Sequence, residues 1–304
     1  MGHALVSSIG SVVRGHDDVV VMVVAAVLSG GHVLVEDAPG SGKTTLARAL
    51  ARSLGGRFAR IQGTSDLMPA DITGSGVWNP DHHAFDVVPG PLFANVVLVD
   101  ELNRTPPRTQ SGFLEAMEES GVTIDGRRYP LPDPFTLIAT QNPLEQHGTY
   151  PLPEGQLDRF TVSLTLGALS RADERLVVQE QLVRATVGDL VPVVDPTQLI
   201  AAREQVRHVH VADDVLDYGL AVVQGTRSDP RVVVGASPRA ALSLVRLSQA
   251  VAVLHDRDYV LPDDVKMAAV PCLAHRLVLT ANASSTAQSV IREVMARVSV
   301  PVGR

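Results

Sequence analysis

The sequence predicts an α/β fold in which a central parallel sheet is covered by helices and is followed by a purely helical region. In the first half of the chain, short β-rich runs alternate with helical patterns, which is typical of a parallel sheet with helices on both faces. These runs lie at residues 33–36, 57–62, 96–99, 135–139 and 161–166. The second half reads as successive helices, at residues 196–206, 213–226, 238–254, 262–278 and 285–298.

Composition limits the class of protein further. The 304 residues are 45% apolar, which suffices for two hydrophobic cores. The formal charge is −7, with 26 basic against 33 acidic side chains and no basic stripe, and this balance disfavours a nucleic-acid motor. The single cysteine, Cys272, cannot form an internal disulfide and is predicted to be a buried apolar residue, which fits a reducing, cytoplasmic compartment.

The first strongly apolar element is predicted to be a helix. Residues 19–28 form an apolar run of ten residues between Asp17-Asp18 and Gly30-Gly31. A bilayer span needs roughly twice that length. We therefore expect a buried helix and not a membrane anchor.

The strand at residues 33–36 leads directly into a phosphate-binding pattern. Gly40, Gly42, Lys43 and Thr44 match the P-loop G-x-x-x-x-G-K-[ST], with Asp37 in place of the first glycine. A Gly-rich turn between a strand and a helix directs backbone N–H groups toward phosphate oxygens. A structural turn with a surface lysine is the competing interpretation, but the flanking strand and helix favour the nucleotide site.

The sequence thus predicts a nucleoside triphosphate as the ligand and Mg²⁺ as its metal. Lys43 is expected at the β- and γ-phosphates, and the Thr44 hydroxyl on Mg²⁺. The residues expected to bind the nucleotide are Asp37, Ala38, Pro39, Gly40, Ser41, Gly42, Lys43, Thr44 and Thr45.

Two carboxylates end the wholly aliphatic run at residues 96–99. In parallel sheets, ligands bind outside the carboxyl ends of the strands, so Asp100 and Glu101 are expected beside the P-loop. Asp100 would hold the hydrated Mg²⁺ and Glu101 would orient the attacking water. An acidic strand exit without a catalytic role is the alternative.

A third polar strand end and two arginines complete the candidate site. Asn142 follows the run at residues 135–139 and could orient the water or the γ-phosphate, although Asn before Pro also suits a turn. Arg239 stands in the first turn of a helix with Ser237 as N-cap, where an anionic partner would relieve its unfavourable interaction with the helix dipole. For Arg159, a surface pair with Asp158 is the simplest interpretation.

Taken in order, these motifs resemble the MoxR family of AAA+ ATPases. The resemblance covers nearly the whole chain and rests on residues 35–40, 66–74, 90–95, 100–104, 114–119, 139–143, 157–160 and 237–239. It implies that Asn142 is similar to sensor 1 and Arg239 to the sensor 2 arginine of a helical lid. It also implies that Arg159 is similar to an arginine finger that enters the site of the neighbouring subunit. The resemblance therefore implies that this chain assembles as a ring, which we expect to be a hexamer.

The resemblance also implies two inserts and a domain division. An insert in the second helix is expected within residues 64–94, where Gly, Pro, Asp and His interrupt any regular pattern, and a hairpin before sensor 1 at residues 122–129. Such hairpins face the pore in related machines, so Trp78, Arg127, Arg128 and Tyr129 are candidate partner contacts. We expect a nucleotide-binding core at residues 1–168, a linker at 169–195 and a helical lid at 196–304, whose first helix follows the cap signal Asp195-Pro196.

The expected function is Mg²⁺-dependent ATP hydrolysis by a ring that remodels or activates a protein partner. The resemblance suggests a partner with a von Willebrand factor A domain and a chaperone-like role in maturation or cofactor insertion. Two alternatives stay open: a nucleotide-gated scaffold with little turnover, and a magnesium-chelatase-like motor subunit.

Overall fold

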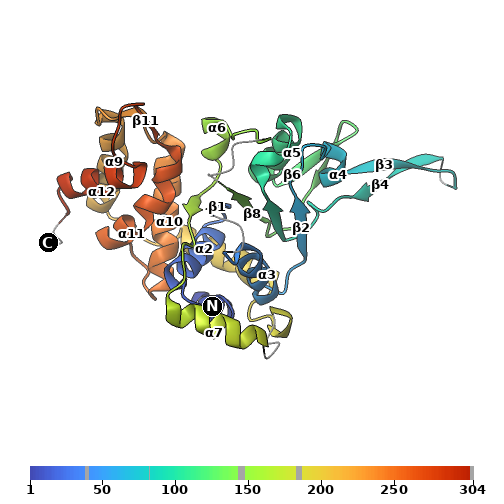
Figure 1. Cartoon of the computed structure of the whole chain (residues 1–304), viewed down its shortest axis with the longest axis horizontal. Helices are drawn as coiled ribbons and strands as arrows, with labels where there is room; N and C mark the ends of the chain where they lie inside the picture. The colour runs from blue at the N-terminus through green and yellow to red at the C-terminus, as the bar shows by residue number, and fades with distance from the viewer. Residues whose placement is uncertain (38–40, 82, 143–147, 183–186, 302–304) are drawn as a thin grey trace.

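The computed structural model describes residues 1–37, 41–81, 83–142, 148–182 and 187–301. Three parts follow one another along the longest axis of the molecule: a helical part, a sheet with its helices, and a two-stranded arm (Figure 1). The predicted α/β fold with a C-terminal helical region is confirmed. Among the described helices, none combines the length and the apolar character that crossing a membrane requires.

The central sheet is parallel, and both of its faces are buried. In spatial order its strands are β2 (Phe58–Gln62), β5 (Val96–Asp100), β8 (Thr136–Gln141), β1 (Val33–Glu36) and β9 (Val162–Leu164). All five strands predicted from the sequence are therefore present. In β5, Val96 and Leu98 pack into one hydrophobic cluster while Val97 and Val99 pack into another, which explains why the run is aliphatic throughout.

Helices cover both faces of this sheet. In the first half of the chain they are α1 (Gly2–Gly10), α2 (Asp17–Leu28), α3 (Lys43–Ser53), α4 (Pro69–Thr73) and α5 (Pro107–Glu119). The apolar run that predicted a buried helix lies in α2, and its residues 23–28 are fully buried. The cluster that holds Val33 and Val35 of β1 continues through α2 to Leu247 in the helical region. Sheet and helical region thus share one continuous core.

The helical region carries the predicted caps. Its elements are α8 (Pro196–Arg207), α9 (Asp213–Ser228), β10 (Val232–Val234), α10 (Pro238–Leu254), α11 (Pro262–Leu273), η3 (Ala274–Arg276), β11 (Val278–Leu279) and α12 (Ala287–Arg297). Asp195 accepts a hydrogen bond from the Gln198 amide, and Ser237 accepts one from the Ala240 amide, so both N-caps are confirmed. The predicted helix over residues 262–278 is too long: α11 ends at Leu273, because the following turn leads into β11, which pairs with β10.

The insert within residues 64–94 is more regular than the sequence suggested. After α4, it forms an antiparallel arm of β3 (Gly74–Asn79) and β4 (Ala84–Pro89). Glycine stands at the base of the arm because the strands approach closely there: a Cβ on Gly74 would lie 2.1 Å from the carbonyl oxygen of Val88. Gly74 and Pro89 lie at the ends of the strands, Gly76 and Asp86 are accommodated within them, and Trp78 pairs with Phe85.

Two further segments test the sequence predictions. The hairpin before sensor 1 is confirmed as β6 (Gly121–Ile124) and β7 (Arg127–Pro130), which turn at Asp125 and Gly126, both of positive φ. The segment 169–195, expected as a linker, contains the helix α7 (Arg171–Leu182) and the turn η2 (Val187–Asp189). Cys272 is fully buried, as predicted.

Candidate functional site

The P-loop connects β1 to the N-terminus of α3. Gly42 is the N-cap of α3 and has φ +94°, a conformation that strongly favours glycine. Lys43 Nζ donates a hydrogen bond to the carbonyl oxygen of Asp37 at 3.1 Å and lies 3.5 Å from Ser41 Oγ. Its ammonium group therefore contacts residues that precede α3. Thr45 follows in the first turn of α3. The predicted contacts of Ala38, Pro39 and Gly40 lie outside the described residues.

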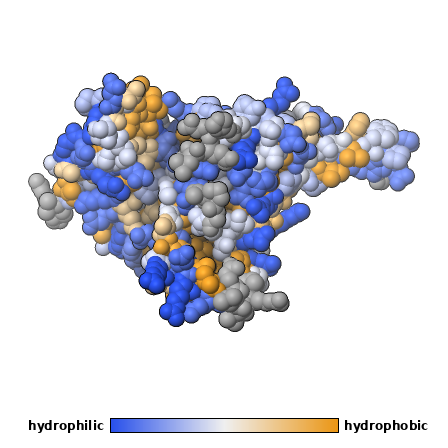
Figure 2. All heavy atoms as spheres, in the orientation of Figure 1, coloured by the Kyte–Doolittle hydropathy of each residue, from blue (hydrophilic) through white to orange (hydrophobic). Residues whose placement is uncertain are grey.

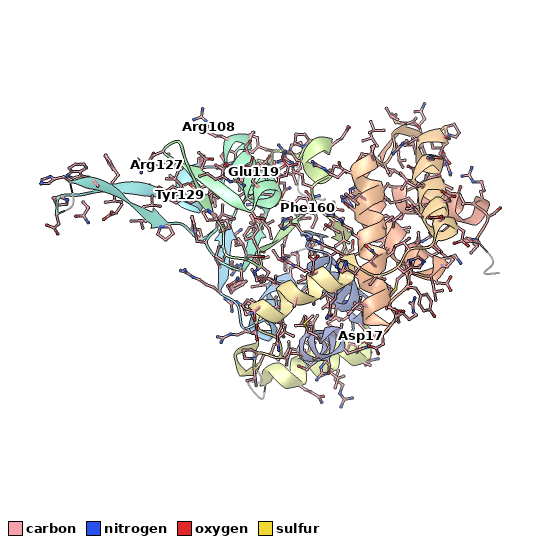
Figure 3. All side chains as sticks on the ribbon, turned by 180° about the vertical axis from the view of Figure 1, so that it is seen from behind. Asp17, Arg108, Glu119, Arg127, Tyr129 and Phe160 are labelled. Carbon is pink, nitrogen blue, oxygen red and sulfur yellow. The ribbon has the colours of Figure 1, made fainter. Side chains whose placement is uncertain are left out.

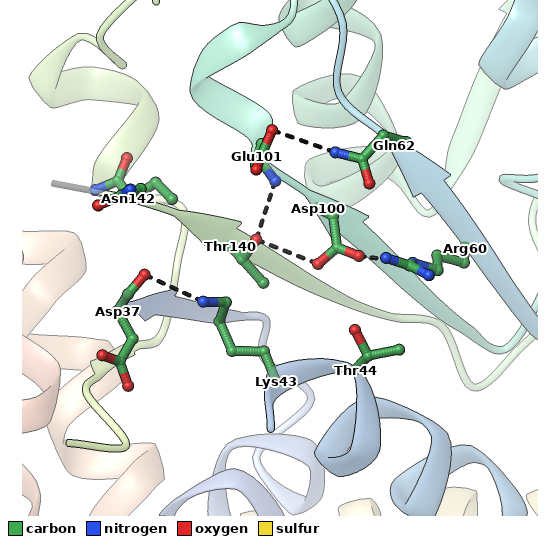
Figure 4. A pocket seen from close by; sticks show the side chains of 10 residues that line it. Asp37, Lys43, Thr44, Arg60, Gln62, Asp100, Glu101, Thr140 and Asn142 are labelled. Carbon is green, nitrogen blue, oxygen red and sulfur yellow. Dashed lines mark hydrogen bonds and ion pairs between the residues drawn. The ribbon is translucent and has the colours of Figure 1, made fainter. Parts of the chain in front are cut away.

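Asp100 and Glu101 stand at the carboxyl end of β5. The Asp100 carboxylate is nearly buried, and its Oδ2 accepts a hydrogen bond from Arg60 Nε at 2.6 Å. Thr140 Oγ1 on the adjacent β8 lies 3.4 Å from Asp100 Oδ1 and accepts a hydrogen bond from the Glu101 amide at 3.0 Å. Polar side chains from three neighbouring strands therefore meet at one sheet edge (Figure 4).

The backbone of Glu101 is in the left-handed region, with φ 57° and ψ 50°. A non-glycine residue in this region costs free energy, and such residues concentrate at functional sites. The side chain is fixed as well, because Glu101 Oε2 lies 3.0 Å from Arg104 Nε and 3.3 Å from Gln62 Nε2. A carboxylate held in this way can present its other oxygen in one direction.

These side chains enclose a cavity of about 160 Å³. Its lining residues are Asp37, Lys43, Thr44, Arg60, Gln62, Asp100, Glu101, Thr140, Gln141 and Asn142. The structure thus brings together predicted site residues from the P-loop, from the end of β5 and from the end of β8. Ser41, Gly42 and Thr45 belong to the loop and to α3 but are not part of this lining.

The donors in the cavity suit a nucleotide with a hard cation. Thr44 and Asp100 supply a hydroxyl and a carboxylate, the oxygen ligands that Mg²⁺ prefers, and Mg²⁺ commonly takes only one or two protein ligands beside waters and phosphate oxygens. No group of three or more His, Cys, Asp or Glu side chains able to hold a metal ion occurs in the part of the chain that the structure describes. The residues present therefore fit a Mg²⁺ that arrives with a phosphorylated ligand.

Arg159 and Arg239 do not line this cavity but meet each other elsewhere. Arg159 follows α6 (Glu154–Leu157), and its Nη2 lies 3.0 Å from Oε2 of Glu118. Arg239, in the first turn of α10, places its Nη1 2.9 Å from Oε1 of the same carboxylate. Glu118, near the end of α5, thus binds one arginine through each oxygen, and we call these three residues the Glu118 cluster.

The surface pair between Asp158 and Arg159, which sequence spacing favoured, is not formed. Asp158 Oδ1 instead lies 3.1 Å from Arg276 Nε, and both carboxylate oxygens accept hydrogen bonds from Ser237 Oγ at 3.1–3.2 Å. Adjacent residues of one turn therefore hold different partners, because their side chains point to different elements.

Several side chains at the site were missed from the sequence. Arg60 and Gln62 alternate along β2 and point to the edge where β5 ends, so the strand order, once known, would have placed them. Thr140 lies on β8, two residues before Asn142, and could have been found by the same argument. Glu118 belongs to the motif at residues 114–119, but its pairing with two arginines was not predicted, because an acidic residue near a helix end is ordinarily solvated.

Known protein families match this chain in two segments. The profile of the ATPase family associated with various cellular activities (AAA) matches residues 32–162, and the profile of the AAA lid domain matches residues 224–294. The first segment contains the cavity, and the second contains α10 with Arg239.

Individual relatives extend over nearly the whole chain. The uncharacterized protein YeaC of Bacillus subtilis is 45% identical, with 98% of this chain and 94% of that protein covered. The chaperone MoxR1 of Mycobacterium tuberculosis is 39% identical, with 95% and 80% covered, and the protein MoxR of Methylorubrum extorquens is 31% identical, with 89% and 85% covered. A crystal structure from Cytophaga hutchinsonii superimposes with a TM-score of 0.89 at 33% identity, covering 98% of this chain and 94% of that one.

Proposed function

The chain belongs to the MoxR family of AAA+ ATPases, and from this premise we propose that it binds ATP with Mg²⁺ and hydrolyses it in the cavity between Lys43 and Asp100. The observation that carries the proposal is the convergence of the P-loop lysine, two acidic residues and one amide at the carboxyl edge of a parallel sheet. Fold alone would not suffice, since function depends on the site.

Each residue has a chemical task in this proposal. Lys43 would neutralise charge on the β- and γ-phosphates, while Thr44 and Asp100 would hold a Mg²⁺, which would supply further positive charge to the phosphates. Glu101 orients the attacking water and accepts its proton, and Asn142 acts beside it as sensor 1. The hydrogen bonds of Glu101 to Gln62 and Arg104 support this role, because they hold the carboxylate in one place before the substrate arrives.

We assign Arg159 to the neighbouring subunit's nucleotide, as the resemblance implied, and we also assign Arg239, which was expected only as a sensor 2 arginine, to that nucleotide. Both guanidinium groups are partly exposed, and both converge on one carboxylate instead of the cavity of their own chain. Two arginines that can share one carboxylate are spaced so that they can also share one phosphoryl group. A closed ring, expected to be a hexamer, would bring them to the next cavity, because head-to-tail interfaces generate rings.

The test is Mg²⁺-ATP hydrolysis per subunit across a wide range of protein concentration, repeated with increasing fractions of Arg159→Ala protein. We expect a specific rate that rises with protein concentration and falls as the fraction of Arg159→Ala protein increases, since each variant subunit disables the site of its neighbour. A rate that depends neither on the protein concentration nor on the fraction of the variant would remove Arg159 from the site. Nucleotide binding to Arg159→Ala, measured separately, should stay unchanged.

For the work done with this energy we propose remodelling or activation of a protein partner, with a von Willebrand factor A domain protein as the first candidate. Support comes from a relative named as a chaperone and from the arm, whose Val77, Trp78, Phe85 and Val88 are each at least half exposed. Figure 2 shows apolar and polar residues intermixed along this arm. On the nearby hairpin, Arg127 and Tyr129 lie beside the base of the arm (Figure 3).

A nucleotide-gated scaffold is the second candidate, and Glu101→Gln separates it from a motor. A motor loses its effect on the partner when hydrolysis stops, whereas a scaffold keeps it or becomes locked in the bound form. A magnesium-chelatase-like motor subunit is distinguished by its partner: stimulation of hydrolysis by a chelatase complex alone would favour that assignment.

A further inference from the structure

The turn that carries Arg159 is held by the helical region and not only by the sheet domain. This turn connects α6 to β9, and its residues Asp158 and Phe160 flank Arg159 on either side. Phe160 is fully buried and lies where the sheet part meets the lid helices (Figure 3). Whatever fixes the backbone of these two residues also fixes the position from which Arg159 extends.

Arg276, at the end of η3, contacts this turn on both sides of Arg159. Its Nη2 donates hydrogen bonds to the carbonyl oxygen of Asp158 at 3.0 Å and to that of Phe160 at 2.8 Å. Its Nε lies 3.1 Å from Asp158 Oδ1, and its side chain is only 2% exposed. One buried guanidinium thus binds the carbonyl oxygens of the residues on either side of Arg159.

The partner carboxylate of Arg276 also reaches the helix that carries Arg239. Asp158 accepts hydrogen bonds from Ser237 Oγ, and Ser237 is the N-cap of α10, two residues before Arg239. The contacts of Asp158 with Arg276 and Ser237 therefore tie the Arg159 turn to the start of α10. The two arginines of the Glu118 cluster therefore lie on two segments, one in the core and one in the lid, that are connected through Asp158.

His275, the residue before Arg276, adds no second positive charge at physiological pH. Burial together with the Arg276 charge lowers the pKa of His275 to about 3, so its ring is neutral. The His275 ring nitrogen Nε2 contacts the carbonyl oxygen of Phe160 at 3.0 Å, which adds a second lid contact to the same turn. Burial raises the pKa of the Cys272 thiol, whose Sγ accepts a hydrogen bond from Arg276 Nη1.

A buried ion pair is a poor way to gain stability alone. Desolvation of the two charges offsets most of their attraction, and apolar replacements of similar volume are often as stable. What an arginine adds to such an ion pair is fixed geometry, since a planar guanidinium holds several hydrogen-bond acceptors in one plane. Here the acceptors that Arg276 holds are the backbone carbonyls on either side of Arg159, a proposed catalytic arginine.

We propose that Arg276 is a positioning residue for Arg159, acting through the backbone of Asp158 and Phe160, so that docking of the lid sets the finger that the chain presents to its neighbour. This inference rests on the proposed function of Arg159 in trans. It predicts a defect that lies in the finger of a subunit and leaves the nucleotide cavity of the same subunit intact.

The test is rescue of one inactive subunit by another. Arg276→Met keeps its own cavity but presents a misplaced finger, so its kcat should fall on the order of 10²-fold while KM for ATP changes little. Glu101→Gln is inactive in its own cavity but presents a normal finger. In rings formed from equal amounts of both variants, we expect roughly half of the wild-type rate per Arg276→Met subunit, because each subunit has one finger-donating neighbour.

A second mixture tests the proposed role of Arg159 in trans separately from the positioning role of Arg276. Arg159→Ala mixed with Glu101→Gln must also regain activity if the finger acts in trans. Rescue of Arg159→Ala but not of Arg276→Met would overturn the positioning role and leave the finger intact. No rescue in either mixture would remove the finger in trans itself, and the inference would fall with it.

Two further variants cover the case in which Arg276→Met fails to fold. The double variant Asp158→Asn/Arg276→Met leaves no unpaired buried charge, which is the main penalty of the single change. The matched control is Asp264→Asn/Arg257→Met, which removes another buried lid ion pair, at 2.6 Å, that lies in the segment from residue 257 to α11. The first double variant should be inactive alone and rescued by Glu101→Gln, while the control should need no rescue. Equal loss of activity in both would contradict the inference.

Discussion

The nucleotide cavity and the Glu118 cluster are assembled in different ways. The cavity draws its side chains from the ends of adjacent strands and from the start of α3, so the hydrogen bonding of one sheet holds them. The Glu118 cluster draws from α5, from the turn after α6 and from α10 in the lid. The cavity is therefore fixed by local topology, whereas the cluster depends on how the lid docks. Substitutions in the lid should therefore impair the Glu118 cluster and leave the nucleotide cavity intact.

The largest expected effects separate two functions within the cavity. Lys43→Ala should abolish nucleotide binding, because it removes the cation at the phosphates. Glu101→Gln should keep nucleotide binding and lower the rate of hydrolysis on the order of 10²-fold or more, because it removes the general base. Binding of a fluorescent ATP analogue and steady-state phosphate release measure the two effects. If Glu101→Gln hydrolysed at the wild-type rate, the assignment of the catalytic base would be wrong.

Arginine substitutions should show the opposite pattern to Lys43→Ala. Arg159→Ala should lower kcat by about 10³-fold, since a finger stabilises charge in the transition state. Arg239→Ala should act in the same direction, and neither change should alter the affinity for the nucleotide of the isolated subunit. Equilibrium binding of the nucleotide to wild-type and variant proteins, measured at a protein concentration too low for ring assembly, tests this prediction. Weaker nucleotide binding by the isolated variant subunits would mean that the arginine acts in the nucleotide cavity of its own subunit. The proposed difference between the cavity and the Glu118 cluster would then be wrong.

Acid should weaken both regions through one buried histidine in each. Burial lowers the pKa of His32, beside the sheet, to about 4, and burial with the Arg276 charge lowers that of His275, at the lid joint, to about 3. Unfolded histidine titrates near 6.5, so below that pH the unfolded state binds more protons than the folded state. The free energy of unfolding should therefore decrease as the pH falls from about 6.5 to 4, by roughly 1 kcal/mol per pH unit for each histidine.

Urea unfolding between pH 7 and 5 tests this dependence. His275→Gln should flatten the slope by about the contribution of one proton. A slope identical in the wild-type protein and in His275→Gln would show that His275 does not titrate on unfolding.

The smallest expected effect concerns the carboxylate of the Glu118 cluster. In Glu118→Gln, Arg159 and Arg239 lose a competing anion, so hydrolysis should increase at protein concentrations near the midpoint of assembly. Partly exposed ion pairs contribute about 0.2–1 kcal/mol, which limits the gain to less than about tenfold. Glu119→Gln, one residue away and paired with Arg128, is the matched control. A decrease in the rate for Glu118→Gln alone would instead mean that the carboxylate holds the arginines in a productive position.

Much of the sheet and its edge could be predicted from the sequence, because these features are local in the chain. Short β-rich runs predicted all five strands, and the position of Asp100 after the aliphatic run at residues 96–99 indicated its place at the sheet edge. The arm was missed because Gly and Pro were taken as breakers of the whole segment, although Gly74 stands at its base. The Glu118 cluster depends on contacts between α5 and α10, more than 100 residues apart, which no periodicity reveals.

The continuous core also has a consequence for synthesis of the chain. Gly2 in α1 packs so closely against Leu254 that a Cβ there would lie 2.4 Å from its Cδ2, and α2 shares a cluster with Ile291 of α12. Helices α1 and α2 therefore leave the ribosome before the helices that cover part of their apolar surface. Because folding during translation starts from the N-terminal side, a nascent chain of this protein exposes that surface until α10 and α12 have been added, and in this interval it most needs protection from aggregation.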